Sequence, residues 1–407
     1  MARSVARTGI LWTGLEKVLV YGITFVQGVI LARLLGPEDF GLAAMLGIFL
    51  GVGGILAESG LGTALVVSPA FLAVERRVLR WNLGLAALLY VALAVAAPGI
   101  ASWYGKPVLM PLMWVMAAGL LVNAASVVSV ARLTRGKRFD RLAGLNGAAS
   151  ILGASAAIAL AWAECGVWAI AGQGLVTAMV RTALAWCLSR PASGDSDASG
   201  DSRAAFGRLL GYGAKLMASG LIHTVYTESY NLVIGKLWSP VSVGLFARGG
   251  RWARLPGEIA NEAVGRVALP ELVGALGKGW KFSFINCLLL WPGLVVLYFF
   301  TTPIVRCVLG GTWLDCVPYL KILLVGQFLT PISGIALQMI RASGRSDVLL
   351  RTDAVKKPIG LVALACGIPF GVLGLCWAKV ADDAAEALVD VLFVAKLKKT
   401  CKENPHD

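Results

Sequence analysis

Long apolar segments alternate with short polar ones along the whole chain. Each apolar segment is about as long as a helix must be to cross a bilayer, roughly 20 residues. The pattern therefore predicts an all-α, polytopic membrane protein with about twelve transmembrane helices. The expected segments are 9–32, 40–66, 81–101, 107–131, 142–162, 166–189, 209–235, 241–270, 282–309, 317–341, 348–369 and 372–396.

One polar stretch differs in kind from the other loops. Its sequence, PASGDSDASGDS, is small, acidic and low in complexity, which is typical of a flexible linker. It leaves six predicted helices on each side. We therefore expect an N-terminal six-helix lobe, a flexible cytoplasmic linker, a C-terminal six-helix lobe and a cytoplasmic tail, at residues 1–190, 191–207, 208–397 and 398–407.

The two predicted lobes resemble copies of one another. LARLLGPEDFGLAA (31–44) aligns with IGKLWSPVSVGLFA (234–247) at an offset of 203, which matches Pro37 with Pro240. Further matches follow at an offset of 207. Six helices in each copy give both copies the same orientation, as in parallel-repeat transporters. The repeat predicts two parallel lobes around a central cavity that holds the ligand.

Composition and charge support a membrane protein. Hydrophobic residues make up 57% of the 407 residues and charged residues 15%, against about a quarter charged in soluble domains. The net charge of +14 would suit a nucleic acid, but the basic residues recur between the apolar segments, so we expect no nucleic-acid partner. One set of alternate loops has about six times more basic residues than the other, which predicts that both termini are cytoplasmic.

Signatures of enzymes and metal sites are missing from the sequence. It has no Gly-rich phosphate loop, no HExxH and no nucleophile elbow, and its only histidines are His223 and His406. The eight cysteines form no CxxC or Cys/His cluster. We expect a protein that is not an enzyme, with no catalytic residue, no metal and no cofactor, although coupling to H⁺ or Na⁺ is open.

The segment 241–270 carries a one-sided charged stripe. At 100° per residue, six charges fall within an arc of roughly 120°: Arg248, Arg251, Arg254, Glu258, Glu262 and Arg266. Such a stripe is costly in a membrane unless it faces water or a charged ligand. Because guanidinium groups suit diphosphates and sugar acids, Arg248, Arg251 and Arg254 are candidate substrate-binding residues. The alternative is pairing within the helix, as between Arg254 and Glu258.

Two lysines are weaker candidates for the same cavity. Lys215 shares a helix face with His223, Tyr226 and Tyr230, yet it could also be a snorkelling end residue. Lys17 lies on the polar side of the first helix, where the alternative is a pair with the neighbouring glutamate.

Four carboxylates are candidates for coupling transport to a cation: Glu58, Glu258, Asp382 and Asp383. Glu58 is isolated in its apolar segment. The two aspartates belong to an acidic stripe on 372–396 that also contains Lys379, Glu386 and Asp390. This stripe has three interpretations: a coupling-ion site, an oligomer contact, or a helix that lies in the membrane interface.

Three motifs resemble Wzx-type polysaccharide flippases of the MOP (MATE-like) transporter superfamily. They are RLLGPEDFGLAAM and ILAESGLGTALV near the start, and PYLKILLVGQFLTPISGIALQMIRASGRSDVLL later in the chain. The similarity extends over nearly the whole chain. It implies a cavity that opens alternately to each face and is lined by the first, second, seventh and eighth helices, which favours Lys17 and Glu58. Many relatives continue for two further helices.

The resemblance also implies a substrate and partners. The substrate would be an oligosaccharide linked to a lipid diphosphate of the undecaprenyl type, moved across the inner membrane for export of O-antigen, exopolysaccharide or capsule. Membrane lipids, a polysaccharide polymerase and glycosyl transferases would be its partners.

Other classes remain open. A MATE-like exporter of small molecules would need an acidic, aromatic cavity for cationic drugs. A membrane-embedded polysaccharide polymerase or glycosyl transferase would need a long loop or a catalytic carboxylate cluster. A shortened, inactive relative is the third alternative.

Overall fold

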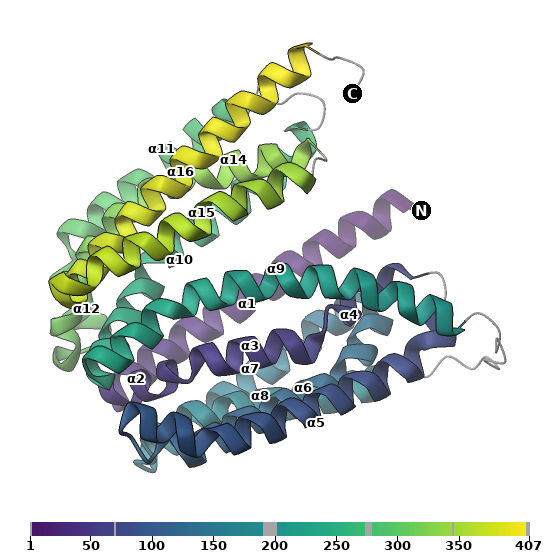
Figure 1. Cartoon of the computed structure of the whole chain (residues 1–407), viewed down its shortest axis with the longest axis horizontal. Coiled ribbons are helices and arrows are strands. Elements are labelled where there is room, and N and C mark those ends of the chain that lie inside the picture. The colour runs from purple at the N-terminus through teal and green to yellow at the C-terminus, as the bar shows by residue number, and fades with distance from the viewer. Residues whose placement is uncertain (1, 69–70, 190–201, 273–278, 344–345, 404–407) are drawn as a thin grey trace. The chain divides into compact units, whose positions relative to one another are not determined.

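The structure is a computed structural model that describes residues 2–68, 71–189, 202–272, 279–343 and 346–403. Within these ranges the regular elements are all helices (Figure 1). The all-α prediction is confirmed, and each predicted apolar segment coincides with one helix or with a broken series of helices. Most of the linker predicted at 191–207 lies outside the described residues.

The chain divides into two compact units, Met1–Val241 and Ser242–Asp407. Helices of the first unit are α1 (Ala2–Leu34), α2 (Pro37–Met45), α3 (Gly47–Glu58), α4 (Leu61–Val67), α5 (Phe71–Tyr104), α6 (Leu109–Arg135), α7 (Phe139–Trp162), α8 (Trp168–Leu188) and α9 (Ser202–Leu237). Those that follow are α10 (Pro240–Leu272), α11 (Gly279–Phe299), α12 (Thr301–Val308), η2 (Gly311–Cys316), α13 (Val317–Gln327), α14 (Thr330–Ala342), α15 (Ser346–Gly367), η3 (Ile368–Phe370) and α16 (Gly371–Glu403). The predicted lobe boundaries stay a prediction.

The membrane character of the fold is confirmed in part. By length and composition, six helices of the described residues can cross a membrane, or up to eight if each of two bent pairs is one span. The chain is thus a multi-pass membrane protein. Helix α10 is not among the six, because its charged stripe leaves it no long stretch without charge. The count of about twelve spans stays a prediction.

The repeat seen in the sequence has a counterpart in the helix boundaries. Helix α1 ends at Leu34 and α2 begins at Pro37, while α9 ends at Leu237 and α10 begins at Pro240, which preserves the offset of 203. Proline suits the first turn of a helix because its nitrogen has no proton to leave unbonded. The two copies therefore end one helix and begin the next at equivalent positions.

The second predicted helix, 40–66, is broken where the second copy is continuous. Ser59 and Gly60 both have left-handed backbones, with φ of 48° and 61°, and they separate α3 from α4. The Ser59 hydroxyl donates a 2.7 Å hydrogen bond to Oδ1 of the buried Asn82 on α5. A Cβ at Gly60 would lie 2.6 Å from the backbone oxygen of Gly213 on α9, so only glycine allows this approach.

Buried apolar side chains and one ion pair surround this break. Leu61, Leu65, Val78 and Leu209 belong to the largest apolar cluster described in the first unit. On α6, the Arg132 guanidinium donates to both oxygens of Glu75 on α5 at 2.8 and 2.9 Å, a bidentate arrangement. The end of α4 is thereby held between α5, α6 and α9.

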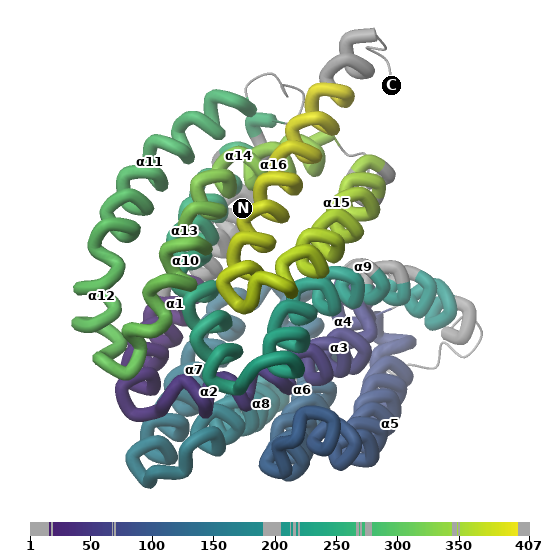
Figure 2. Tube along the Cα trace, turned by 60° about the vertical axis from the view of Figure 1, so that its left-hand side comes forward, coloured from purple at the N-terminus to yellow at the C-terminus, as the bar shows by residue number. Residues whose placement is uncertain are grey.

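In the second unit, α15 and α16 lie side by side along their lengths (Figure 2). A second apolar cluster joins α10, α14 and α16 through Ala268, Ile335, Met339 and Val394. This packing gives α10 one buried face and leaves the other face for its charged stripe.

We expect Gly60→Ala to destabilise the protein by about 1–3 kcal/mol, because alanine disfavours the left-handed backbone and would also meet the backbone of α9. Thermal unfolding of the detergent-purified protein measures the effect. Gly84→Ala on α5 is the matched control, since a Cβ there meets no atom within 4 Å. Equal melting temperatures for both variants would contradict a role for Gly60 at the break.

Candidate functional site

The arginines predicted on α10 lie on a face that packing leaves open. Arg251 and Arg254 are exposed and Arg248 is half-buried. Arg254 and Glu258 form an ion pair on this face, at 3.9 Å between Nε and Oε1. Both side chains are about half exposed, 47% and 56%, so this pair contributes little to the stability of the protein. The side chains of Arg266 and Lys215 lie outside the described residues.

Small residues form the opposite face of α10. Gly249, Gly250, Ala253 and Gly257 are buried. A Cβ at Gly249 would lie 3.1 Å from Cys316 Sγ and 3.5 Å from the backbone nitrogen of Leu320, so α10 approaches η2 and α13 closely there. The glycine face holds α10 against its neighbours, whereas Arg251 and Arg254 are exposed on the other side of the helix.

The acidic stripe of α16 is neutralised by lysines. Lys379 Nζ lies 2.6 Å from Asp382 and 2.9 Å from Asp383 on the same helix. From α15, Lys357 donates a 3.0 Å hydrogen bond to Glu386, and Lys356 pairs with Asp390. We call this set of contacts the α15–α16 ion-pair ladder.

Several members of the ladder are deeply buried. Asp382 is 0% exposed, Asp390 2% and Lys356 7%. Lys356 lies on the face of α15 that packs against α16, where it pairs with Asp390. Because these carboxylates are buried and paired, the acidic stripe mainly packs α16 against α15. Within the described ranges no group of His, Cys, Asp and Glu is arranged to hold a metal ion.

The candidates on α1 and α9 are less clearly placed. Lys17 is half-buried, and its neighbour Glu16 accepts a 2.6 Å hydrogen bond from Asn146 on α7. Tyr226 and Tyr230 of α9 are buried, with ring centroids 6.5 Å apart in an edge-to-face contact. The predicted polar face of α9 is therefore partly a packing face.

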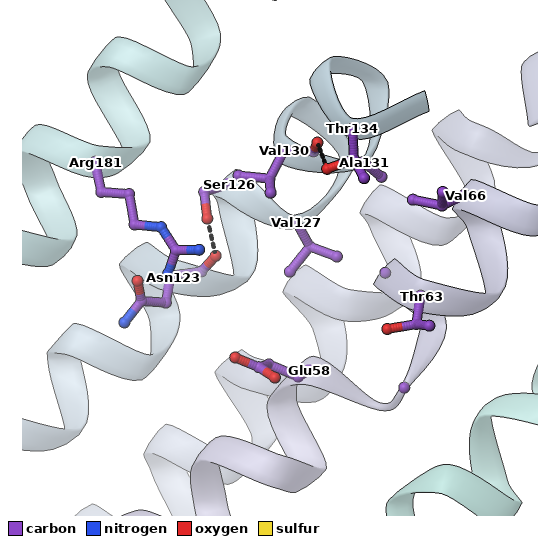
Figure 3. A pocket seen from close by; sticks show the side chains of 12 residues that line it. Glu58, Thr63, Val66, Asn123, Ser126, Val127, Val130, Ala131, Thr134 and Arg181 are labelled. Carbon is purple, nitrogen blue, oxygen red and sulfur yellow. Dashed lines mark hydrogen bonds between the residues drawn. The ribbon is translucent and has the colours of Figure 1, made fainter. Parts of the chain in front are cut away.

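Glu58, the last residue of α3, lines a pocket within the first unit. The pocket has a volume of about 380 Å³ and is lined by α3, α4, α6 and α8. Figure 3 shows that Glu58 and Arg181 reach toward it from different helices, with Asn123 and Ser126 between them on α6. Neither charge has an ion-pair or hydrogen-bond partner among the side chains described, and the buried Arg181 Nε is without an acceptor.

Three polar residues of this pocket were not predicted from the sequence: Arg181, Asn123 and Ser126. A signal for Arg181 existed, since a lone arginine within the apolar segment 166–189 is a functional candidate by default. Asn123 and Ser126 had none, because single amides and hydroxyls are common in membrane helices.

The sequence is similar to that of proteins of polysaccharide biosynthesis. The family described as "Polysaccharide biosynthesis protein" matches residues 30–318. The succinoglycan biosynthesis transport protein ExoT of Rhizobium meliloti (strain 1021) is 25% identical over 379 residues, which cover 90% of this chain and 75% of ExoT. The lipopolysaccharide biosynthesis protein WzxC of Escherichia coli (strain K12) is 22% identical over 370 residues, 88% of this chain and 74% of WzxC.

Solved structures support the same fold. A lipid II flippase MurJ in an inward closed conformation superposes with a TM-score of 0.75 at 14% identity, over 95% of this chain and 87% of MurJ. An inward-facing multidrug resistance MATE family transporter of the MOP superfamily gives 0.71 at 17% identity, over 97% and 99%. The resemblance in the sequence motifs is confirmed, as is the expectation that the chain is not an enzyme, since the relatives named for an activity are transporters and a flippase.

We expect Lys356→Ala to destabilise the protein by about 3–5 kcal/mol, because the buried carboxylate of Asp390 then has no counter-charge. Thermal unfolding in detergent measures the loss. Arg351→Ala on the exposed side of the same helix is the matched control, expected within about 0.5 kcal/mol of the wild type.

A double variant tests whether the pair or the lysine stem matters. Lys356→Met with Asp390→Leu removes both charges and keeps the apolar volume, so it should recover most of the stability. A loss for Lys356→Ala no larger than for Arg351→Ala would contradict a structural role for this pair.

Proposed function

Because this chain belongs to the polysaccharide biosynthesis protein family, we propose that it is a flippase for a lipid-linked oligosaccharide. The substrate would be of the undecaprenyl-diphosphate type, moved from the cytoplasmic to the outer leaflet of the inner membrane. The single observation that carries the proposal is the arginine stripe of α10, because its exposed guanidinium groups would suit an anionic lipid carrier. Export of O-antigen, exopolysaccharide or capsule is the process it would serve.

The chemistry of the stripe supports a diphosphate ligand. A guanidinium group presents its donors in a planar fork that fits two phosphate oxygens at once. Arg251 and Arg254 are exposed for such contacts, while the half-buried Arg248 is the more rigidly held of the three. The 3.9 Å pair with Glu258 leaves Arg254 readily available, because an exposed pair of this length is weak. Lys17 and Lys215 remain secondary candidates.

The transport cycle proposed here is alternating access. Two parallel six-helix lobes would open a central cavity to each face in turn, with both termini in the cytoplasm. Such a cycle needs no covalent chemistry on the glycan. A polysaccharide polymerase and glycosyl transferases are the expected partners on either side of the transport step.

Coupling to H⁺ or Na⁺ is part of the same proposal. Lys379 already supplies the counter-charge for Asp382 and Asp383. A bound cation is therefore needed less there than at Glu58 or Glu258. Of these two we prefer Glu258 as the coupling residue, because a cation at Glu58 would meet Arg181 in the same pocket.

The central test replaces single arginines of the stripe. Arg251→Ala and Arg248→Ala should each lower surface polysaccharide by at least roughly tenfold, the effect of losing a charge-assisted hydrogen bond. Variants are expressed in a strain that lacks this gene, and both surface polysaccharide and membrane-inserted protein are quantified. Arg251→Lys, which keeps the charge but not the fork, should fall between alanine and the wild type.

Arg138→Ala is the matched control, because it removes one exposed positive charge at the start of α7, a helix that does not belong to the stripe. It should leave surface polysaccharide unchanged. Normal polysaccharide in both alanine variants of the stripe, at normal protein levels, would refute the assigned site. An unchanged polysaccharide level on deletion of the gene itself would refute the function.

A further inference from the structure

The pocket that contains Glu58 and Arg181 combines two opposite charges without pairing them. We call it the Glu58–Arg181 pocket. Among the residues described, neither side chain forms an ion pair, although ion pairs join charged groups elsewhere in both units. Arg181 Nε is buried and has no acceptor. A buried donor without an acceptor is costly, so this Nε favours a ligand that brings an anionic group to the pocket.

The framework around the pocket fixes the position of Glu58. Directly after it, Ser59 and Gly60 take left-handed conformations and end α3. Ser59 is bonded to Asn82, and Gly60 contacts Gly213, so the break cannot slide. The Glu58 carboxylate thus projects from a rigid corner, which suits a ligand contact better than a freely moving side chain would.

The opposite wall contributes the cationic and the neutral polar groups. Arg181 extends from α8 toward Asn123 (Figure 3). The Ser126 hydroxyl donates a 2.8 Å hydrogen bond to the backbone oxygen of Asn123, which leaves its own oxygen free to accept. Thr63 and Thr134 also line the pocket, and the Thr134 hydroxyl donates to the backbone oxygen of Val130. The apolar part of the lining is Val66, Val127, Val130 and Ala131.

The charges select the class of ligand. A simple anion drawn to Arg181 would meet the Glu58 carboxylate, and a simple cation drawn to Glu58 would meet the guanidinium. A ligand with both signs satisfies both groups at once and brings no net charge into the membrane segment. The volume of about 380 Å³ suits a small head group rather than an oligosaccharide.

We propose that the Glu58–Arg181 pocket binds a zwitterion in which a primary ammonium lies a few bonds from a phosphate or carboxylate. Glu58 accepts from the ammonium, and Arg181 with the Asn123 amide donates to the anion. The phosphoethanolamine head group of a membrane lipid has this chemistry, with its glycerol part against the apolar wall. Free phosphoethanolamine has it too. This site goes beyond the proposed transport function and does not depend on it.

The test uses the purified full chain, delipidated in detergent and titrated with four probes. These are dioleoyl phosphatidylethanolamine, phosphatidylcholine, phosphatidylglycerol and free O-phosphoethanolamine. Native mass spectrometry reports the bound fraction. We expect phosphatidylethanolamine to bind roughly tenfold more tightly than phosphatidylcholine, whose quaternary ammonium donates no hydrogen bond, and than phosphatidylglycerol, which has no cation.

Two variants separate the halves of the site. Glu58→Gln should lose the preference for phosphatidylethanolamine over phosphatidylglycerol, because the acceptor of the ammonium is gone. Arg181→Gln should weaken binding of phosphatidylethanolamine and phosphatidylglycerol alike. Glu164→Gln and Arg138→Gln, which change exposed charges elsewhere in the first unit, are the matched controls and should bind as the wild type does.

The outcomes decide between support and rejection. Retention of phosphatidylethanolamine alone supports the site with a lipid source, and equal retention of O-phosphoethanolamine supports it with a soluble source. Equal binding of the three lipids, or wild-type selectivity in Glu58→Gln, overturns the proposal. If Arg181→Gln does not fold, Glu58→Gln alone decides, since its side chain is exposed to the pocket and makes no contact that folding requires.

Discussion

The cost of leaving a charge without a partner inside a membrane segment governs the arrangement of this protein. The charged residues that the structure shows as buried, Glu75, Lys356, Asp382 and Asp390, are all paired. Glu75 accepts two hydrogen bonds from Arg132, and three lysines neutralise the acids of α16. Against this background the exceptions carry meaning. Arg251 is exposed on α10, and Glu58 and Arg181 line one pocket without pairing.

The two kinds of charge differ in what they can do. A buried pair such as Lys356 with Asp390 is expensive to break and therefore acts as a structural fastener between α15 and α16. An exposed pair such as Arg254 with Glu258, at 3.9 Å, exchanges readily with a ligand. The degree of burial therefore distinguishes the two stripes. The acidic stripe of α16 is mainly structural, whereas the cationic stripe of α10 is partly exposed.

Much of the fold could be predicted from the sequence, because a helix is the one way for a single apolar segment to satisfy its backbone in lipid. The α10 stripe was also predictable, since its residues share one helix and periodicity alone aligns them. Contacts between charged residues on different helices could not be predicted in this way. Arg181 and Glu58 come together only through the packing of α8 and α3 around α6, and the counter-charges of α16 lie partly on α15. Only Ser59–Gly60, a common breaker dipeptide, gave notice of the broken helix.

The two copies of the repeat share a polar clamp but differ in what they build on it. In the first unit, the buried Asn82 of α5 accepts a hydrogen bond from Ser59. In the second unit, the buried Asn286 of α11 donates a hydrogen bond to Asn261 of α10. Each residue of the second bond lies within one position of where the repeat offset of 203 would place its counterpart, and we call the two bonds together the polar clamp. Because both copies have the clamp, it does not cause the break between α3 and α4 in the first copy. The cause of this break is local, because Gly60 aligns with an alanine that continues α10 as a helix. The first copy thus acquires a corner that presents one carboxylate, and the second a straight helix that can align a row of cations.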